Sequence, residues 1–484
     1  MFKTISDMPV SFYYLIGRVV TAIGQIVLIR VLTAVLVPSE LGKYYLLIAT
    51  ASWFSLLIIN PVSVYVSRHI YPWNEEKVAV RAVRYFVVYV MFVALLTSLV
   101  LLLLYNFRVI TLQTKIFVFG LFIPLFVFFT FLSGFWPNLL NLLHRRLAFV
   151  FFSSSNVWGK IVIILLSTAI ISHTAETVFL GIILWAAVLS LLSGMYLWLH
   201  LKKPSKPREV SSYSIDYREL FKFAWPLAIA VGLYWGQSQG YRFVLKYTSG
   251  MAVVGKFVVA YSLGAALVTM VESLFNQIYQ PIYYKEIAPG TKVAYREAWT
   301  KLAEYGVGVY VPLGVFAACA GPYLGKWLLA PAYRDMGIYA AFGALSELFR
   351  GFSSLSYLGF VAKKDTLPFV LRGAIGTLIA IVGVWSLSKM HPLLGTGCAL
   401  VLSNMVVSVA LYLRLKKDLA VSFPWRKMVA SLALTLPVLA LLILGYKFDL
   451  NISSLSNLVV LFSSGLMLLF SQWKLSKDLW FERI

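Results

Sequence analysis

The chain has few charged residues and few of the side chains that enzymes use most. Only 13% of its 484 residues are Asp, Glu, Lys or Arg, against about 25% in an average soluble domain. Five histidines and two cysteines, Cys319 and Cys398, show neither metal-ligand spacing nor a disulfide pattern. No GxxxxGK[ST] segment is present, which argues against an internal ATPase. We therefore expect no enzyme, no metal and no cofactor.

Long apolar segments take the place of these groups. Hydrophobic residues make up 60% of the chain. A membrane-spanning helix needs about 20 mostly apolar residues, and unpaired backbone cannot face lipid. The sequence therefore predicts an all-α polytopic membrane protein with about 14 transmembrane helices. They are expected near residues 12–35, 41–66, 83–105, 116–141, 147–171, 178–200, 219–245, 252–280, 302–327, 335–361, 367–389, 393–415, 428–446 and 455–472.

The net charge of +23 is distributed unevenly over the predicted loops. Loops on the N-terminal side carry about 28 Lys and Arg residues, and those on the other side about eight. Cytoplasmic loops carry such an excess, so both termini are expected in the cytoplasm. Most of the basic residues are thus expected to set the topology and to attract anionic membrane lipids. We expect no binding to nucleic acid.

A sequence repeat suggests an internal duplication. Gly24-Gln25 followed by Arg30 recurs 212 residues later as Gly236-Gln237 followed by Arg242. Gly42-Lys43 recurs 213 residues later as Gly255-Lys256. We therefore expect two six-helix halves related by a pseudo-two-fold axis along the membrane normal, which is a transporter architecture. The expected parts are an N-terminal lobe (1–205), a cytoplasmic linker (206–218), a C-terminal lobe (219–418) and two additional C-terminal helices with a cytoplasmic tail (419–484).

Several basic side chains fall inside predicted spans, where each costs at least ~2.5 kcal/mol unless it faces water or a partner. They are Arg18, Arg30, Lys160, Arg242, Lys256 and Arg350. Long side chains near helix ends can instead reach the headgroups, and the sequence leaves this open for most of them. Lys160 is nearer the centre of its span, which favours a cavity or a partner.

Two further groups of polar residues lie within spans. Glu272, Asn276 and Gln280 share one helical face at i, i+4 and i+8, either as a seam between helices or as a cavity wall. Glu347 and Arg350, three residues apart, can form an ion pair that is either structural or a gate.

The junction LIRVLTAVLVPSELGKYYLLIATAS at 28–52 carries a family resemblance. Its pattern of Arg30, Leu32-Thr33, Glu40-Leu41-Gly42 and Tyr44 resembles that of Wzx-like polysaccharide repeat-unit flippases. These are bacterial proteins of the multidrug/oligosaccharidyl-lipid/polysaccharide exporter superfamily. The 14-helix plan and the basic cytoplasmic turns are similar as well.

The resemblance implies a function. Such a protein flips undecaprenyl-pyrophosphate-linked oligosaccharide, a repeat unit of lipopolysaccharide or exopolysaccharide, across the bacterial inner membrane by alternating access through a cationic central cavity. Arginine suits a diphosphate because its planar fork binds phosphate oxygens in pairs. The expected partners are this cargo, membrane lipids, and polysaccharide polymerase and chain-length proteins. We expect a monomer, and a coupling H⁺ or Na⁺ is left open.

The implied site has three groups of residues. The residues expected to bind the substrate are Arg18, Arg30, Arg242, Lys256, Arg350 and Lys160. The residues expected to form the polar wall of the cavity are Gln25, Gln237, Glu272, Asn276 and Gln280. The gate or ion-coupling candidates are Glu272, Glu347 and Arg350.

Two other functions are weighed against this one. A drug/cation antiporter of the same superfamily should carry acidic rather than basic groups in its cavity. A membrane-embedded polysaccharide polymerase or ligase should carry a large periplasmic loop with catalytic groups, and every predicted outer loop here is short.

Overall fold

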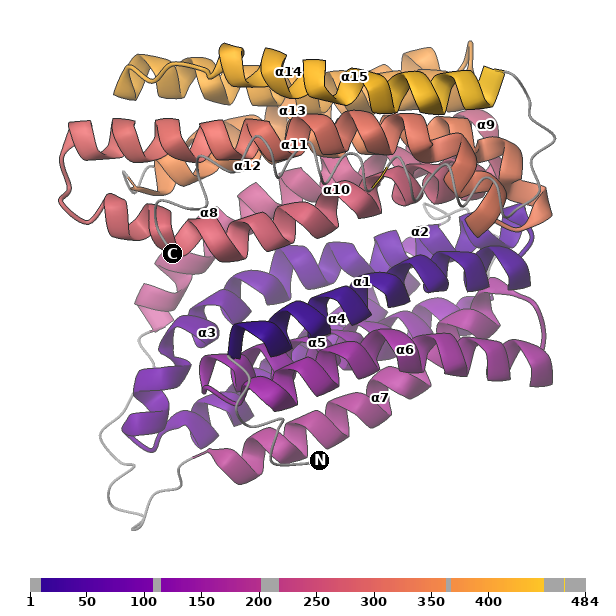
Figure 1. Cartoon of the computed structure of the whole chain (residues 1–484). Coiled ribbons are helices and arrows are strands. Elements are labelled where there is room, and N and C mark those ends of the chain that lie inside the picture. The colour runs from indigo at the N-terminus through magenta and orange to yellow at the C-terminus, as the bar shows by residue number, and fades with distance from the viewer. Residues whose placement is uncertain (1–9, 108–114, 202–216, 363–366, 448–464, 466–484) are drawn as a thin grey trace, which may run out of the picture. The chain divides into compact units, whose positions relative to one another are not determined.

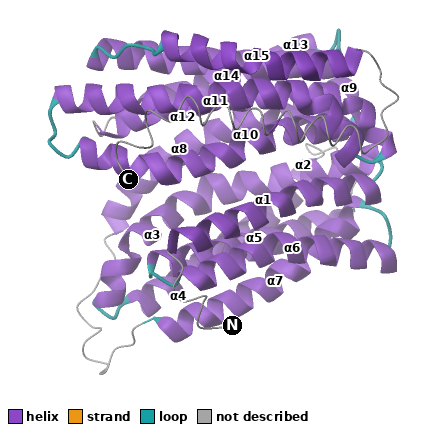
Figure 2. Ribbon diagram, in the orientation of Figure 1, coloured by secondary structure: helices purple, strands orange, loops and turns teal. Residues whose placement is uncertain are grey.

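The structure, a computed structural model, describes residues 10–107, 115–201, 217–362, 367–447 and 465 (Figure 1). Every regular element in these ranges is a helix (Figure 2). The α-helices are α1 (Val10–Val35), α2 (Pro38–Phe54), α3 (Asn60–Glu75), α4 (Ala79–Asn106), α5 (Ile123–Leu142), α6 (Arg146–Ile170), α7 (Ala175–His200), α8 (Tyr217–Trp235), α9 (Tyr241–Ser249), α10 (Met251–Glu286), α11 (Lys292–Leu328), α12 (Ala340–Ala362), α13 (Leu367–Leu387), α14 (Pro392–Leu419) and α15 (Trp425–Lys447). Short π-helices η1 (Ser55–Ile59), η2 (Val118–Phe122) and η4 (Gly236–Gly240) and the 3₁₀-helix η5 (Pro331–Tyr339) join some of them.

The predicted all-helical membrane fold is confirmed. Helices cover each of the first thirteen segments expected from the sequence, and the last, 455–472, lies outside the described residues apart from residue 465. Eight of the described helices or continuous helical runs are long and apolar enough to cross a membrane. Some predicted spans are interrupted helices. For example, 219–245 is α8, η4 and α9 in succession.

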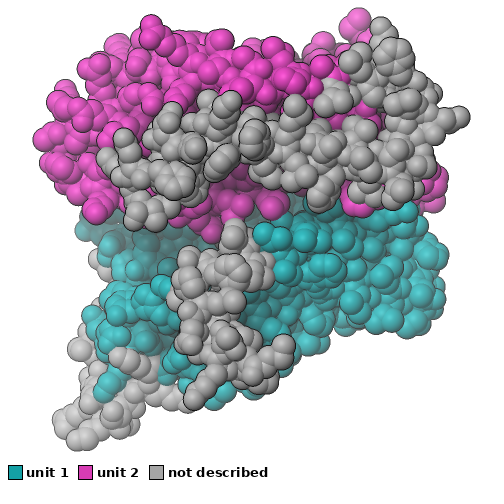
Figure 3. Space-filling model, viewed as in Figure 1, with its two compact units in different colours: residues 1–36, 43–235 teal, residues 37–42, 236–484 magenta. Residues whose placement is uncertain are grey.

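The chain forms two compact units (Figure 3). Unit 1 comprises residues 1–36 and 43–235, and unit 2 comprises residues 37–42 and 236–484. In unit 1, α6 packs against α1, α5 and α7, and α4 packs against α5. In unit 2, α12 packs against α10, α11 and α14, and α15 packs against α11.

The boundary between the units differs from the expected one at 206–218. Helix α8, which we expected in the C-terminal lobe, packs in unit 1 against α3 and η1. At its end, the Trp235 indole N–H donates to the Ala49 carbonyl at 3.1 Å and to Ser52 Oγ at 3.0 Å. Near its start, the Arg68 guanidinium lies 4.7 Å from the Phe223 ring centroid. These tertiary contacts are not visible in a repeat pattern.

Two glycines allow a close approach of α1 to α6 in unit 1. A Cβ atom on Gly17 would lie 2.6 Å from Val150 Cγ1, and one on Gly24 would lie 2.8 Å from Val157 Cγ1. Glycines seven residues apart lie on one helical face, so both turn toward α6. The Trp158 indole N–H adds a hydrogen bond to the Val20 carbonyl at 3.2 Å. The spacing of the glycines therefore serves tight helix packing.

The repeated Gly-Lys motif forms a reciprocal contact inside unit 2. A Cβ atom on Gly42 would lie 2.0 Å from the Met251 carbonyl oxygen, and one on Gly255 would lie 2.1 Å from the Pro38 carbonyl oxygen. The offset of 213 that relates the two glycines also relates Pro38 to Met251. The contact of Gly42 with Met251 is therefore equivalent to the contact of Gly255 with Pro38. Self-complementary interfaces about a two-fold axis have the same reciprocal pattern.

Candidate functional site

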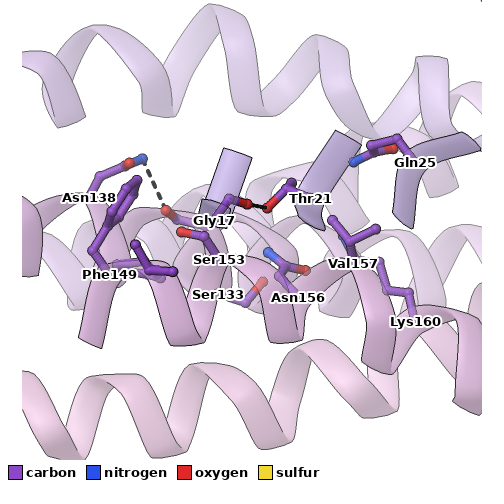
Figure 4. A pocket seen from close by; sticks show the side chains of 13 residues that line it. Gly17, Thr21, Gln25, Ser133, Asn138, Phe149, Ser153, Asn156, Val157 and Lys160 are labelled. Carbon is purple, nitrogen blue, oxygen red and sulfur yellow. Dashed lines mark hydrogen bonds between the residues drawn. The ribbon is translucent and has the colours of Figure 1, made fainter. Parts of the chain in front are cut away.

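A polar pocket lies within unit 1, between α1, α5 and α6 (Figure 4). Its volume is about 240 Å³. Ser133, Ser153 and Asn156 gather at the centre in the view of Figure 4, with Asn138 at one end and Lys160 near the other. Small and polar residues dominate the lining, and none of the thirteen lining residues is acidic.

Helical periodicity places these residues on the helix faces that line the pocket. On α6, Ser153, Asn156 and Lys160 follow each other at i, i+3 and i+7, so they share one face. On α1, Thr21 and Gln25 are four residues apart and share a face in the same way. The Thr21 hydroxyl donates to the Gly17 carbonyl at 2.7 Å.

Helix α5 contributes a proline and a glycine to the pocket wall. Pro137 has no N–H, so the Ser133 carbonyl lacks its usual helical donor. The Asn138 side-chain amide donates to the Gly134 carbonyl at 3.0 Å. A Cβ atom on Gly134 would meet no atom within 4 Å. The wall therefore has free space and an extra backbone acceptor at this point.

The pocket is cationic and has an unsatisfied acceptor. No described residue forms an ion pair with Lys160, a half-buried side chain near the middle of α6. Asn156 Oδ1 is buried and has no hydrogen-bond partner among the described residues. Buried polar atoms are paired in the great majority of cases. Both groups are therefore suited to a ligand that brings a negative charge and a hydrogen-bond donor.

A second polar centre, in unit 2, is an ion cluster. The Arg350 guanidinium on α12 pairs with Glu347 on the same helix and with Glu272 on α10. Its Nη1 donates to Glu272 Oε1 at 3.3 Å, and the Thr269 hydroxyl donates to Glu347 Oε2 at 3.3 Å. Glu272 is only 5% exposed. With all three groups ionised, this cluster has a formal charge of −1.

The ion cluster changes the expectation for Arg350. The sequence placed Arg350 among the cations of a substrate cavity, but two carboxylates compensate its charge. Glu272 is the first residue of the polar stripe on α10, and it faces α12. This part of the stripe is therefore a contact between two helices. Further along the stripe, Gln280 donates to the Tyr284 hydroxyl at 3.2 Å, and Asn276 is half-buried.

Gln237 belongs to a neutral network in unit 2. Its side-chain nitrogen donates to Ser403 Oγ at 2.9 Å and to Asn404 Oδ1 at 3.3 Å, both on α14. Asn404 in turn donates to Ser346 Oγ at 2.8 Å. Gln237 is 3% exposed, so its amide joins η4 to α14 where the sequence had suggested a cavity wall.

The remaining predicted cations lie in both units. Arg30 is half-buried on α1, and its Nη1 is buried without a hydrogen-bond partner among the described residues. Arg242 on α9 and Lys256 on α10 are half-buried in unit 2. The side chain of Arg18 lies outside the described residues.

The structure thus brings together some of the predicted site residues and not others. Lys160 and Gln25 line the same pocket, and Glu272, Glu347 and Arg350 form one cluster. Sequence reasoning missed the neutral pocket residues Thr21, Ser133, Asn138, Ser153 and Asn156. The i, i+3, i+7 spacing of Ser153, Asn156 and Lys160 was the available signal.

Comparison with known proteins places the chain in a family. A family model described as "Polysaccharide biosynthesis protein" matches residues 11–283, more than half of the chain. The chain belongs to this family. No curated protein sequence matches it.

Solved structures share the fold of this polysaccharide biosynthesis family member. Lipid II flippase MurJ in an inward closed conformation is 13% identical, with a TM-score of 0.69 over 97% of this chain and 99% of that chain. An inward-facing MATE family multidrug resistance transporter of the MOP superfamily is 11% identical, with a TM-score of 0.64 over 83% and 94%. A MOP superfamily transporter from Pyrococcus furiosus is 12% identical, with a TM-score of 0.61 over 85% and 94%. The chain therefore shares the fold of these flippase and transporter structures.

Proposed function

We propose that the protein flips an undecaprenyl-pyrophosphate-linked oligosaccharide from the cytoplasmic to the periplasmic leaflet of a bacterial inner membrane by alternating access. The observation that carries this proposal is the pocket of unit 1. It combines Lys160 with neutral hydrogen-bonding groups and has no carboxylate in its lining. In a transporter fold of a polysaccharide biosynthesis family, such a pocket suits an anionic, hydroxyl-rich cargo.

The arginines of the repeat are the proposed ligands of the cargo's diphosphate. Arg30 and Arg242 occupy equivalent positions in the two copies of the motif. A guanidinium keeps its proton and binds phosphate oxygens through two parallel hydrogen bonds. Arg18 and Lys256 complete the proposed cationic set, which holds the diphosphate while the polyprenyl chain stays in the lipid.

The ion cluster of unit 2 is the proposed coupling site. Two carboxylates share one guanidinium there, so the cluster can accept one further positive charge, H⁺ or Na⁺. A change in that charge would alter the pairing between α10 and α12, and these two helices pack against each other in unit 2. The protein then acts as a monomeric transporter with no catalytic step, and it supplies polysaccharide polymerase and chain-length proteins.

The main rival function is export of cationic drugs, because some solved structures of this fold are multidrug resistance transporters. A cationic drug would need an acidic site. The unit 1 pocket has no acidic lining residue, and the single negative charge left in the unit 2 cluster is the one proposed above to take H⁺ or Na⁺. These observations favour the anionic cargo.

Reconstitution tests the proposal directly. The purified protein in liposomes should expose a fluorescent polyprenyl-diphosphate disaccharide to a membrane-impermeant quencher or lectin faster than protein-free liposomes do. A fluorescent lipophilic cation serves as the parallel cargo for the drug exporter. Transport of the cation without transport of the lipid-linked sugar would overturn the proposal.

A further inference from the structure

We propose that the unit 1 pocket is a subsite for one acidic sugar residue of the cargo, with the sugar carboxylate at Lys160 and sugar hydroxyls at Asn156 and Ser153. This inference rests on the proposed function and adds a substrate class to it: repeat units that contain a uronic acid or another carboxylate-bearing sugar. Three properties of the pocket support it, namely its size, its charge and its hydrogen-bonding groups.

The size of the pocket selects a single sugar. Its volume of about 240 Å³ is below the range of about 300–1,000 Å³ that is typical of pockets for drug-sized ligands. An oligosaccharide or a polyprenyl diphosphate is larger than such ligands. The pocket therefore holds one residue of the cargo while the rest extends beyond it.

The charge of the pocket matches one carboxylate better than a diphosphate. Lys160 is the single ionisable residue in the lining. A diphosphate carries more than one negative charge, and proteins bind such groups with arginine forks or with helix N-termini. Neither is present among the lining residues, which lie within helices α1, α5 and α6. One ammonium group and one carboxylate form a neutral pair, which lowers the cost of placing Lys160 inside a membrane span.

The hydrogen-bonding groups require a ligand that also donates. Asn156 Oδ1 is a buried acceptor with no partner among the described residues. Ionised phosphate and carboxylate groups accept hydrogen bonds but cannot donate them. Sugar hydroxyls do both, so an acidic sugar can satisfy Lys160 and Asn156 together. A simple anion would satisfy only Lys160.

The first experiment compares two cargoes in proteoliposomes. They are fluorescent polyprenyl-diphosphate disaccharides that differ only at the terminal sugar, glucose or glucuronic acid. The wild type should flip the acidic cargo faster. Lys160→Gln should reduce the ratio of the acidic to the neutral rate about tenfold, which corresponds to about 1.4 kcal/mol, and Lys160→Arg should retain most of the ratio.

Matched variants separate the pocket from general effects on folding. Ser153→Ala should slow the flipping of the acidic cargo, because Ser153 is proposed to contact sugar hydroxyls, whereas Ser154→Ala, its neighbour outside the lining, should not. Gly134→Leu should fill the pocket without a backbone clash, because a Cβ atom there meets nothing within 4 Å. Gly308→Leu on α11 is the control, because its Cβ also has open space but lies in unit 2.

A binding experiment distinguishes the sugar from the phosphate as the source of negative charge. Acetylation of Lys160 by an amine-reactive reagent, measured by peptide mass spectrometry, should be slowed by free glucuronate and much less by glucose or inorganic pyrophosphate. Protection by pyrophosphate at least equal to that by glucuronate would overturn the inference and assign the pocket to the diphosphate.

The outcomes also separate this inference from the proposed function. If the wild type flips both cargoes equally and Lys160→Gln leaves their ratio unchanged, the acidic-sugar subsite is wrong and the flippase stands. If the wild type flips neither cargo, the flippase itself fails.

Discussion

At the scale of single residues, the structure separates compensated from uncompensated charges. Arg350 has two carboxylate partners, whereas no described residue pairs with Lys160. In sequence, both are basic residues inside apolar helices and look alike. The pairing of Glu347 with Arg350 is local, at i and i+3, and was foreseeable. The pairing with Glu272 joins residues 78 positions apart and required the tertiary structure.

Removal of the Arg350 charge should destabilise unit 2. Arg350→Gln leaves Glu272 and Glu347 facing each other without a cation, and breaking a buried ion pair costs about 3–5 kcal/mol. The thermal unfolding midpoint of the detergent-solubilised protein should therefore drop clearly. The triple variant Glu272→Gln/Glu347→Gln/Arg350→Gln should recover part of the loss, because no unpaired charge remains. An Arg350→Gln midpoint equal to that of the wild type would show that the cluster does not contribute to stability.

At the scale of helices, apolar length and periodicity predicted most of the fold. Thirteen expected segments are helical because each must satisfy its own backbone hydrogen bonds in lipid. The assignment of α8 to unit 1 could not be predicted, because it depends on contacts such as Trp235 with Ala49 and Ser52. The pocket was only half predicted. Its charged residue is conspicuous in an apolar helix, but serines and asparagines there have many structural uses.

The reciprocal glycine contact gives a prediction for two helices at once. Gly42→Ala and Gly255→Ala each place a Cβ about 2 Å from a backbone carbonyl oxygen, which cannot move as a side chain can. Because the contact is reciprocal, both variants should lower the thermal unfolding midpoint by similar amounts, with a cost of about 1–3 kcal/mol or more.

Gly308→Ala is the control for this pair, because its Cβ has open space on a helix of the same unit. It should keep or raise the midpoint, since alanine favours a helix over glycine by about 1 kcal/mol. A lower thermal unfolding midpoint for only one of the variants Gly42→Ala and Gly255→Ala would contradict the reciprocal contact.

At the scale of the whole molecule, the distribution of charge connects topology with transport. The Lys and Arg residues behind the net charge of +23 lie mostly in loops predicted to be cytoplasmic, where they would attract anionic lipids and fix the orientation. The cations inside the helices, of which Lys160 forms no ion pair with any described residue, serve a different purpose under the proposed function. They offer an anionic headgroup a stepwise path across a region that would otherwise exclude it.

This division of charge predicts that the membrane potential drives the cargo outward. An anionic headgroup that leaves a compartment at negative potential gains about 2.3 kcal/mol per net charge per 100 mV. In proteoliposomes, valinomycin and a potassium gradient can set the membrane potential. A potential that is negative on the side from which the cargo starts should accelerate flipping, and the reversed potential should slow it. The acidic cargo carries one more negative charge than the neutral one, so its rate should respond more steeply. An equal response to both polarities would mean that compensating cations move with the cargo, which would place the coupling ion in the same step as the headgroup.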